Sequence, residues 1–440
     1  MTFSITAIRG AFLDCLGDPF LVNTDQSIRY IPDGLLVLRA GKILDFGPYK
    51  PMSDRYSSVP TTTYPGRLIT PGLVDTHTHF PQTEMIASYG SQLLEWLERY
   101  TFPTEQKFQD VDYAAAVAEV FLDEILRNGT TTAMVLATVF PVSVSALFEA
   151  ARSRNLRLIT GKVMMDRHAP SGLLDTAKTS YEESLKLIET WHGCDRLSYA
   201  VTPRFAPTST PEQLQLAGQL LREFPDLYLQ THLSENLQEV AWVRELFPDC
   251  VDYLDVYEQA GLVGDRSIFA HSIHLSDSEF QRLSHSGSSI AFCPTSNLFL
   301  GSGLFNIAQA KSPEFPISVG LATDVGAGTS FSLLRTASEA YKVAQLQGQS
   351  LSAFQLFFLI TLGGARSLHL DDHIGNFTPG KEADLVIWNS RSTPLMAFRN
   401  PEAMPLTLED LHDRLFSLIL MGDDRSVEAV YVMGDRVKKL

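Results

Sequence analysis

Short runs of apolar residues alternate with longer amphipathic segments through the middle of the chain. Each run is nearly continuous in apolar residues, as expected for strands that are covered on both faces. Eight runs are predicted strands, at residues 68–74, 130–137, 156–165, 197–203, 227–232, 267–273, 289–293 and 317–323. The segments between them are predicted helices, for example at residues 113–128, 181–191, 211–224 and 276–285.

Eight strands alternating with helices over roughly 310 residues predict an α/β fold, a (β/α)₈ TIM barrel. A doubly wound open sheet is the structural alternative, but the chain has no Gly-x-Gly-x-x-Gly turn to support it. Both chain ends instead show short strands and turns, with β-branched and aromatic residues bounded by Gly and Pro. We expect these ends to pair into one small β-sandwich-like domain. The predicted boundaries are 1–68 and 376–440 for this domain and 69–375 for the barrel.

Composition indicates a packed globular chain and excludes some partners. The hydrophobic fraction is 45% and the charged fraction 20%. Lys and Arg number 35 against 51 Asp and Glu, which gives a net charge of -16. Such a chain repels nucleic acid and anionic membranes, although a free nucleobase carries no phosphate and stays a candidate ligand. No segment approaches the ~20 apolar residues of a membrane span, so we expect neither a nucleic acid nor a membrane partner.

The cysteines and the first residues predict a compartment. Cys15, Cys194, Cys250 and Cys293 form no Cys-x-x-Cys pair, so they indicate neither a disulfide framework nor a structural zinc site. The N-terminus has no basic region followed by an apolar run and a small-residue cleavage site. The prediction is a reducing cytoplasm.

Polar residues gather where the predicted strands end, which is the edge that carries the chemistry in this kind of barrel. His77 and His79 close strand one, and two histidines separated by one strand residue point to the same side. The later strands add His232 and Glu235 after strand five, His271 after strand six and Asp324 after strand eight. Three histidines with a carboxylate are a suitable ligand set for a catalytic zinc that keeps one position open. A single His-x-His is a weak signal, but four strand ends together predict a metal site.

These motifs resemble the amidohydrolase superfamily and, within it, the guanine deaminase family. The resemblance extends over essentially the whole chain. It is carried by residues 74–82, 93–97, 101–105, 202–207, 232–236, 293–298, 300–303 and 323–329.

The resemblance implies a set of roles for individual residues. One zinc ion would be bound by His77, His79, His232 and Asp324, and iron or cobalt would suit the same ligands. Glu235 would carry the proton, His271 would hydrogen-bond the attacking water or the tetrahedral centre, and Asp324 would help to expel ammonia. The purine would be held by Gln82, Arg204 and Phe205, beside His232 and Glu235. The implied reaction is the hydrolysis of guanine to xanthine and ammonia in purine catabolism, by a homodimer.

The residue types fit that substrate. Arg204 only donates, so it suits the O6 acceptor of guanine and not the 6-amino group of adenine. Gln82 can donate and accept along a purine edge, and Phe205 offers a flat ring for stacking. The alternatives are that Phe205 is a packing residue and that Arg204 makes a surface ion pair.

The metal count depends on the end of strand four. Two-metal relatives carry a carboxylated lysine there, where this chain has Arg204. The nearest lysine, Lys162, falls on strand three and is interpreted as an ordinary side chain whose stem lies along apolar surface. We therefore expect one metal ion.

Two other functions stay open. The chain could be another one-metal member that acts on adenine, cytosine, a triazine or an adenosine-type nucleoside. It could also be a catalytically silent relative that serves as a scaffold, although such relatives usually lack the metal ligands that are present here.

Overall fold

The computed structural model describes residues 4–90 and 92–437 and divides into two compact units. The barrel unit consists of residues 75–123 and 133–331, and the sheet unit of residues 1–74, 124–132 and 332–440. The predicted boundaries after residues 68 and 375 stay a prediction.

Eight strands follow one another around the predicted barrel, and this part of the prediction is confirmed. Their order is β5-β6-β7-β9-β10-β11-β12-β13. The strands are β5 (Leu73–His79), β6 (Thr130–Leu136), β7 (Arg157–Gly161), β9 (Leu197–Pro203), β10 (Tyr228–Leu233), β11 (Ser267–His271), β12 (Ser289–Phe292) and β13 (Ser318–Leu321). The two-residue β8 (Val163–Met164) pairs with β9. The ring closes where Thr76 Oγ1 donates to the Leu321 carbonyl at 3.0 Å and the Asp324 amide donates to the His77 carbonyl at 3.0 Å.

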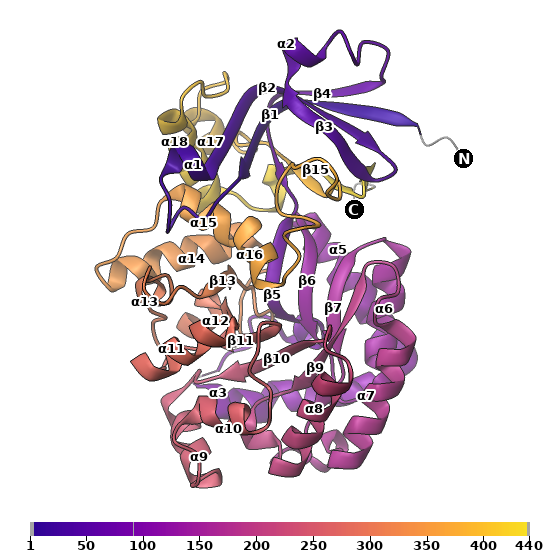
Figure 1. Cartoon of the computed structure of the whole chain (residues 1–440), viewed down its shortest axis with the longest axis vertical. Coiled ribbons are helices and arrows are strands. Elements are labelled where there is room, and N and C mark those ends of the chain that lie inside the picture. Colours follow the sequence, from indigo (N-terminus) through magenta and orange to yellow (C-terminus); the bar gives the residue numbers. More distant parts are fainter. Residues whose placement is uncertain (1–3, 91, 438–440) are drawn as a thin grey trace. The chain divides into compact units, whose positions relative to one another are not determined.

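Helices follow the strands and bury one apolar face each. The principal helices are α5 (Val111–Arg127), α6 (Pro141–Ser153), α7 (Ala177–Trp191), α8 (Pro211–Glu223), α9 (Leu237–Leu246), α10 (Tyr253–Gln259) and α11 (Asp277–Ser286). Helix α11 shows why such helices begin and end where they do. Ser276 and Glu279 form a capping box at its N-terminus, and Gly287, at φ 73°, ends the helix in the left-handed conformation. Figure 1 shows α6, α7 and α8 outside β7 and β9. Among the described residues, no helix is both long and apolar enough to cross a bilayer.

The first predicted strand, at residues 68–74, is wrong as a single element. Its first part ends β4 (Thr61–Pro71), which pairs with β14 (Leu385–Trp388) in the sheet unit, and the barrel strand begins only at Leu73. Because both strands are buried there, the apolar pattern continues across the junction. The chain changes strand at Gly72, where a Cβ would lie 2.0 Å from Thr131 Oγ1 and only glycine fits.

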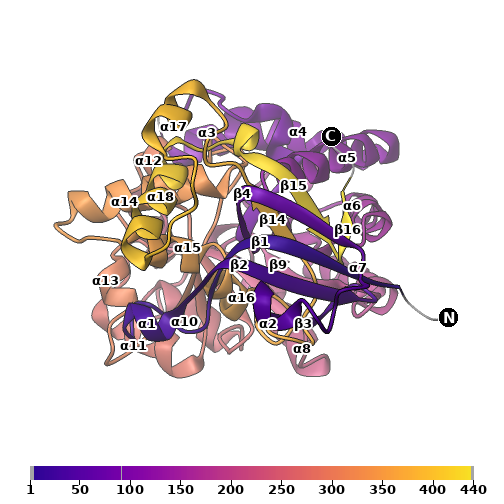
Figure 2. The same ribbon diagram turned by 90° about the horizontal axis from the view of Figure 1, so that it is seen from above.

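The sheet unit joins both ends of the chain, as predicted. Its seven-stranded mixed sheet has the order β16-β15-β14-β4-β1-β2-β3, and Figure 2 shows strands from the two ends side by side. The remaining strands are β1 (Ile5–Cys15), β2 (Ile28–Arg39), β3 (Lys42–Pro48), β15 (Val427–Val432) and β16 (Asp435–Arg436). Phe12, Leu36 and Leu385 lie in the apolar core of this sheet. The unit also contains α14 (Leu333–Leu346), α15 (Ala353–Leu359), α16 (Leu362–Ser367) and α18 (Leu408–Met421).

Candidate active site

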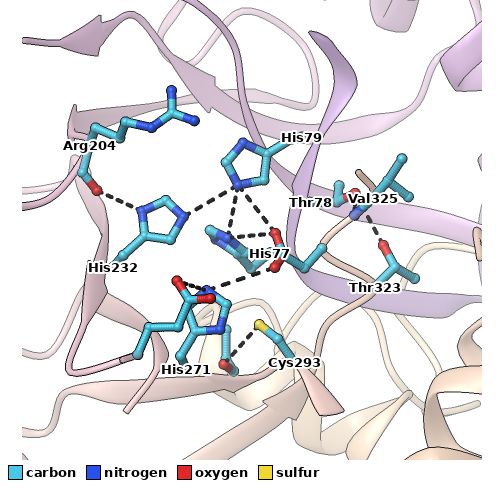
Figure 3. A network of polar contacts seen from close by, with 12 residues as sticks. His77, Thr78, His79, Arg204, His232, His271, Cys293, Thr323 and Val325 are labelled. Atoms are coloured by element: carbon cyan, nitrogen blue, oxygen red, sulfur yellow. Dashed lines mark hydrogen bonds and ion pairs between the residues drawn. The ribbon is translucent and has the colours of Figure 1, made fainter. Parts of the chain in front are cut away.

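The strand ends bring four predicted metal ligands to one point inside the barrel unit. The Nε2 atoms of His77 and His79 lie 3.2 Å apart, and His232 Nε2 lies 3.3 Å from His79 Nε2. Asp324 Oδ1 lies 3.4 Å from His77 Nε2 and 3.2 Å from His79 Nε2. Figure 3 shows the rings of His77 and His79, from β5, converging with that of His232, from β10. Sequence spacing therefore located a real cluster.

The arrangement of donors fits a metal ion. His232 Nδ1 lies 2.6 Å from the Arg204 carbonyl, so this nitrogen carries the proton and Nε2 presents its lone pair to the cluster. Lone pairs facing one another cannot satisfy each other, and a cation at their centre removes the repulsion. Atoms that each bind one ion at about 2.1 Å lie less than about 4.2 Å apart. The pairs measured above, at 3.2–3.4 Å, meet this limit.

Burial sets the protonation that metal binding needs. It lowers the pKa of His77, lowers that of His79 to about 4 and brings that of His232 well below its usual value. Burial opposes ionisation of Asp324, but its contacts with His77 and His79 lower the carboxyl pKa well below the usual range. The cluster thus presents neutral imidazoles and a carboxylate, the forms that bind metals.

Several residues at the candidate site have unusual backbone conformations. Ser234, His271 and Asp324 have φ values of 49°, 68° and 47°, in the left-handed region that non-glycine residues seldom adopt. Such conformations cost on the order of 1–3 kcal/mol each and persist only where the surroundings enforce them. Asp75 is one such support, because its carboxylate accepts from the Thr323 amide at 3.1 Å and from the His77 amide at 3.3 Å. Part of the backbone strain in the described chain therefore lies at the candidate site.

Glu235 and His271 form a second pair next to the cluster. His271 Nε2 lies 3.4 Å from Glu235 Oε2 and 3.8 Å from Asp324 Oδ2. Its Nδ1 donates to Asn297 Oδ1 at 2.8 Å, which fixes the ring. Burial raises the pKa of Glu235 to about 7, against the influence of His271. A carboxyl group with such a pKa can take up and release a proton near neutral pH.

A second buried carboxylate, which the sequence interpretation missed, holds the Glu235 loop. Glu239 accepts from the amides of Glu235 at 2.9 Å and Asn236 at 3.0 Å, and the Tyr253 hydroxyl donates to it at 2.7 Å. It also completes the capping box with which Asn236 starts α9. A capping pattern was visible in the sequence, but its burial was not.

Gln82, Arg204 and Phe205 line the same pocket as His79, His232, Glu235, His271 and Asp324. Its other wall is apolar and includes Leu93 and Trp96 of α3 (Leu93–Trp96). Phe205 is 5% exposed and belongs to the surrounding apolar cluster, so it lines the pocket and packs at the same time. All residues that were predicted to touch a purine therefore surround one space.

Arg204 makes no surface ion pair, which corrects one alternative. Its side chain is 3% exposed, and Nη1 donates to both carboxylate oxygens of Glu105, at 2.9 and 2.8 Å. Burial raises the pKa of Glu105, while Arg204 and a hydrogen bond from Gln82 lower it. Glu105 ends one of the stretches that carry the family resemblance, residues 101–105, but no role was predicted for it, and it lies 99 residues from its partner.

Lys162 also differs from its interpretation. Its side chain is fully buried, forms an ion pair with Asp175 and lies 3.4 Å from Glu183. The surrounding residues are apolar in sequence, and the two carboxylates arrive from later segments, so the pairing could not be read locally. The single-metal expectation, which rests on Arg204 at the end of strand four, stays a prediction.

Comparison with known proteins identifies relatives of the whole chain. The model of the amidohydrolase family matches residues 68–437. The guanine deaminase of Escherichia coli (strain K12) is 52% identical over 435 residues, which are 98% of this chain and 97% of that protein. The solved structure of the E. coli guanine deaminase superposes with a TM-score of 0.95 at 51% identity, covering 99% of each chain. A guanine deaminase structure from C. acetobutylicum with bound guanine in the active site has a TM-score of 0.89 at 28% identity, covering 99% of this chain and 100% of that one.

Proposed function

This chain belongs to the amidohydrolase family, and we propose that its pocket hydrolyses guanine to xanthine and ammonia. The observation that carries the proposal is that one pocket brings residues suited to bind a purine next to residues suited to bind a metal and transfer a proton. Purine-matched side chains, Gln82, Arg204 and Phe205, line the same pocket as the proton carrier Glu235 and the metal-ligand cluster. The full-length identity to the E. coli guanine deaminase supports the same activity. The chain is an enzyme that acts on guanine.

We propose that His77, His79, His232 and Asp324 hold one zinc ion. A bound divalent ion of this kind lowers the pKa of a water molecule toward ~7 and so makes a nucleophile available at neutral pH. Iron or cobalt suits three imidazoles and a carboxylate as well. The protein itself contributes the neutral imidazoles and the dry, shaped surroundings.

Proton transfer falls to the carboxylates. Water adds to C2 of guanine, which carries the amino group, and the ring nitrogen next to it must gain a proton. Glu235 takes the proton from the water and passes it to the ring nitrogen, which its pKa of about 7 permits. His271, 3.4 Å from Glu235, hydrogen-bonds the tetrahedral centre. Asp324 receives the second proton and delivers it to the departing amine, so that ammonia leaves and xanthine remains.

The remaining side chains select the ring. The donors of Arg204 meet O6, Gln82 contacts the purine edge, and Phe205 covers the flat face. Adenine places an amino group where guanine has O6, so two donors would meet there without an acceptor. A buried polar group left without a partner costs about 1–3 kcal/mol, which corresponds to roughly 5- to 150-fold in specificity.

We expect ammonia release from guanine to exceed that from adenine, cytosine and adenosine by about 100-fold in kcat/KM, near the upper end of this range. The measurement is ammonia release by the purified, zinc-loaded chain with each compound in turn. A preference for any of the other three compounds would replace guanine as the substrate. Ammonia release from none of them, in a folded and metal-loaded sample, would support a silent scaffold.

We further propose that the chain acts as a homodimer in the cytoplasm. All four cysteines are free in the structure, as a reducing compartment requires. Light scattering of the purified chain would distinguish a dimer of about twice 48.8 kDa from a monomer.

A further inference from the structure

We infer that Glu105 is a positioning residue that sets the hydrogen-bond polarity of both side chains that read the purine edge. The inference rests on the proposed function. It starts from one juxtaposition: the fully buried carboxylate of Glu105 accepts from Arg204, which lines the pocket together with Gln82.

The position of Glu105 comes from an irregular helical segment. The short helix α3 continues into a π-helical turn, Leu97–Thr101, and then into α4 (Phe102–Glu105). The beginning of this segment supplies apolar pocket wall, and its end supplies Glu105. π-Helical turns are rare and are frequently found at functional sites. One continuous segment therefore shapes the apolar wall and holds the carboxylate.

Glu105 limits what Arg204 can do. Nη1 donates to both carboxylate oxygens, at 2.9 and 2.8 Å, and the guanidinium carbon lies 5.7 Å from the centre of the Phe102 ring. Glu105 thereby fixes one nitrogen of the rigid guanidinium plane, and the Phe102 ring packs nearby. Its Nε and Nη2 donors have no other acceptor among the described residues, and they are left for an acceptor on the ligand.

Glu105 orients Gln82 in the opposite sense. A carboxylate only accepts, so the hydrogen bond between these residues places the amide nitrogen of Gln82 toward Glu105. The carbonyl oxygen then faces the other way, toward Gly326, where a Cβ would come within 2.0 Å of it. Gly326 has φ 122° and leaves room for this orientation. The carbonyl oxygen of Gln82 is thus kept away from Glu105, and we infer that it is the atom that accepts from a ligand held by Arg204.

Together, Arg204 and Gln82 can hydrogen-bond a ring that carries an acceptor next to a donor. The O6 and N1–H groups of guanine show this pattern, and the 6-amino group and N1 of adenine show its reverse. Without the charge of Glu105, the Arg204 cation would be buried without a partner, and the amide of Gln82 could turn over. Glu105 therefore acts on specificity without touching the substrate.

Glu105→Gln tests this inference because it keeps the size and removes the charge. We expect kcat/KM for guanine to fall about 100-fold, mainly through a higher KM, with metal content close to the wild type. The melting temperature should fall as well, because removing one partner of a buried ion pair destabilises the fold. The exposed Glu98→Gln, in the same helical segment, is the matched control and should leave both constants unchanged. A loss confined to kcat, or no loss, would overturn the inference.

The double variant Glu105→Gln/Arg204→Gln shows whether the effect passes through Arg204. Because Glu105 acts through Arg204 and also through Gln82, the losses should be less than multiplicative, and we expect the double variant to be no more than about tenfold worse on guanine than Arg204→Gln alone. Losses that multiply would contradict the inference. If Glu105→Gln does not fold, Glu105→Asp keeps the charge with a shorter stem and should raise KM about tenfold; an unchanged KM would again contradict it. Absence of guanine turnover in the wild type would instead refute the proposed function.

Discussion

Replacing Glu235 by Gln lowers kcat for guanine by about 10²- to 10⁴-fold while the chain keeps its metal. The amide has the same size, but it cannot take the proton from water or return it to the ring nitrogen. Glu235 is placed for this task by its 3.4 Å contact with His271 and by the two amides that fix the loop on Glu239. The measurement combines steady-state turnover of guanine with elemental analysis of the same sample.

The control for this variant lies on the helix that follows. Glu245→Gln removes an exposed carboxylate from α9 and should change neither turnover nor metal content. Loss of metal from Glu235→Gln would make Glu235 a ligand and contradict its role as the proton carrier. Full turnover in that variant would assign proton transfer to another group.

His77→Ala abolishes guanine turnover together with metal binding. The ligand atoms of neighbouring candidate ligands lie 3.2–3.4 Å from one another in a buried site. Removal of one imidazole leaves the ligand set incomplete, and no surface side chain can replace it. We expect less than about 0.1 metal ion per chain after dialysis, and no recovery on adding Zn²⁺. Wild-type chain stripped by a chelator should lose turnover and regain it with Zn²⁺.

The exposed His285 offers a matched histidine outside the site. His285→Ala should retain both metal and turnover, since its ring contacts only Phe315 among the described aromatic residues. A His77→Ala chain that still binds one metal ion per subunit would disprove the ligand set. A chelated wild type that stays active would disprove the need for a metal.

The barrel and most of the site could be predicted from sequence because their signals are local. A strand that is buried on both faces is a continuous apolar run, and the residue that ends it faces the catalytic edge. His77, His79, His232 and Asp324 follow directly from this rule. The resemblance to a family then assigned roles that spacing alone left open.

The remaining features depend on contacts between distant segments. Arg204 and Glu105 are 99 residues apart, and the sequence around either residue does not predict that the two side chains form an ion pair. The buried pairing of Lys162 with Asp175 escaped for the same reason. The junction of β4 and β5 was missed because burial on both sides hides a strand boundary, which only the close approach of Gly72 to Thr131 reveals. Local pattern predicts elements and their ends, whereas pairing of buried charges requires the fold.

The central claim is that this chain replaces the amino group of guanine by oxygen from water. The most direct measurement is to incubate the zinc-loaded chain with guanine in ¹⁸O-labelled water and to follow product mass and ammonia. We expect xanthine carrying one labelled oxygen at C2, with one ammonia released per guanine consumed. Guanine that persists unchanged, or a product without the label, would contradict the account.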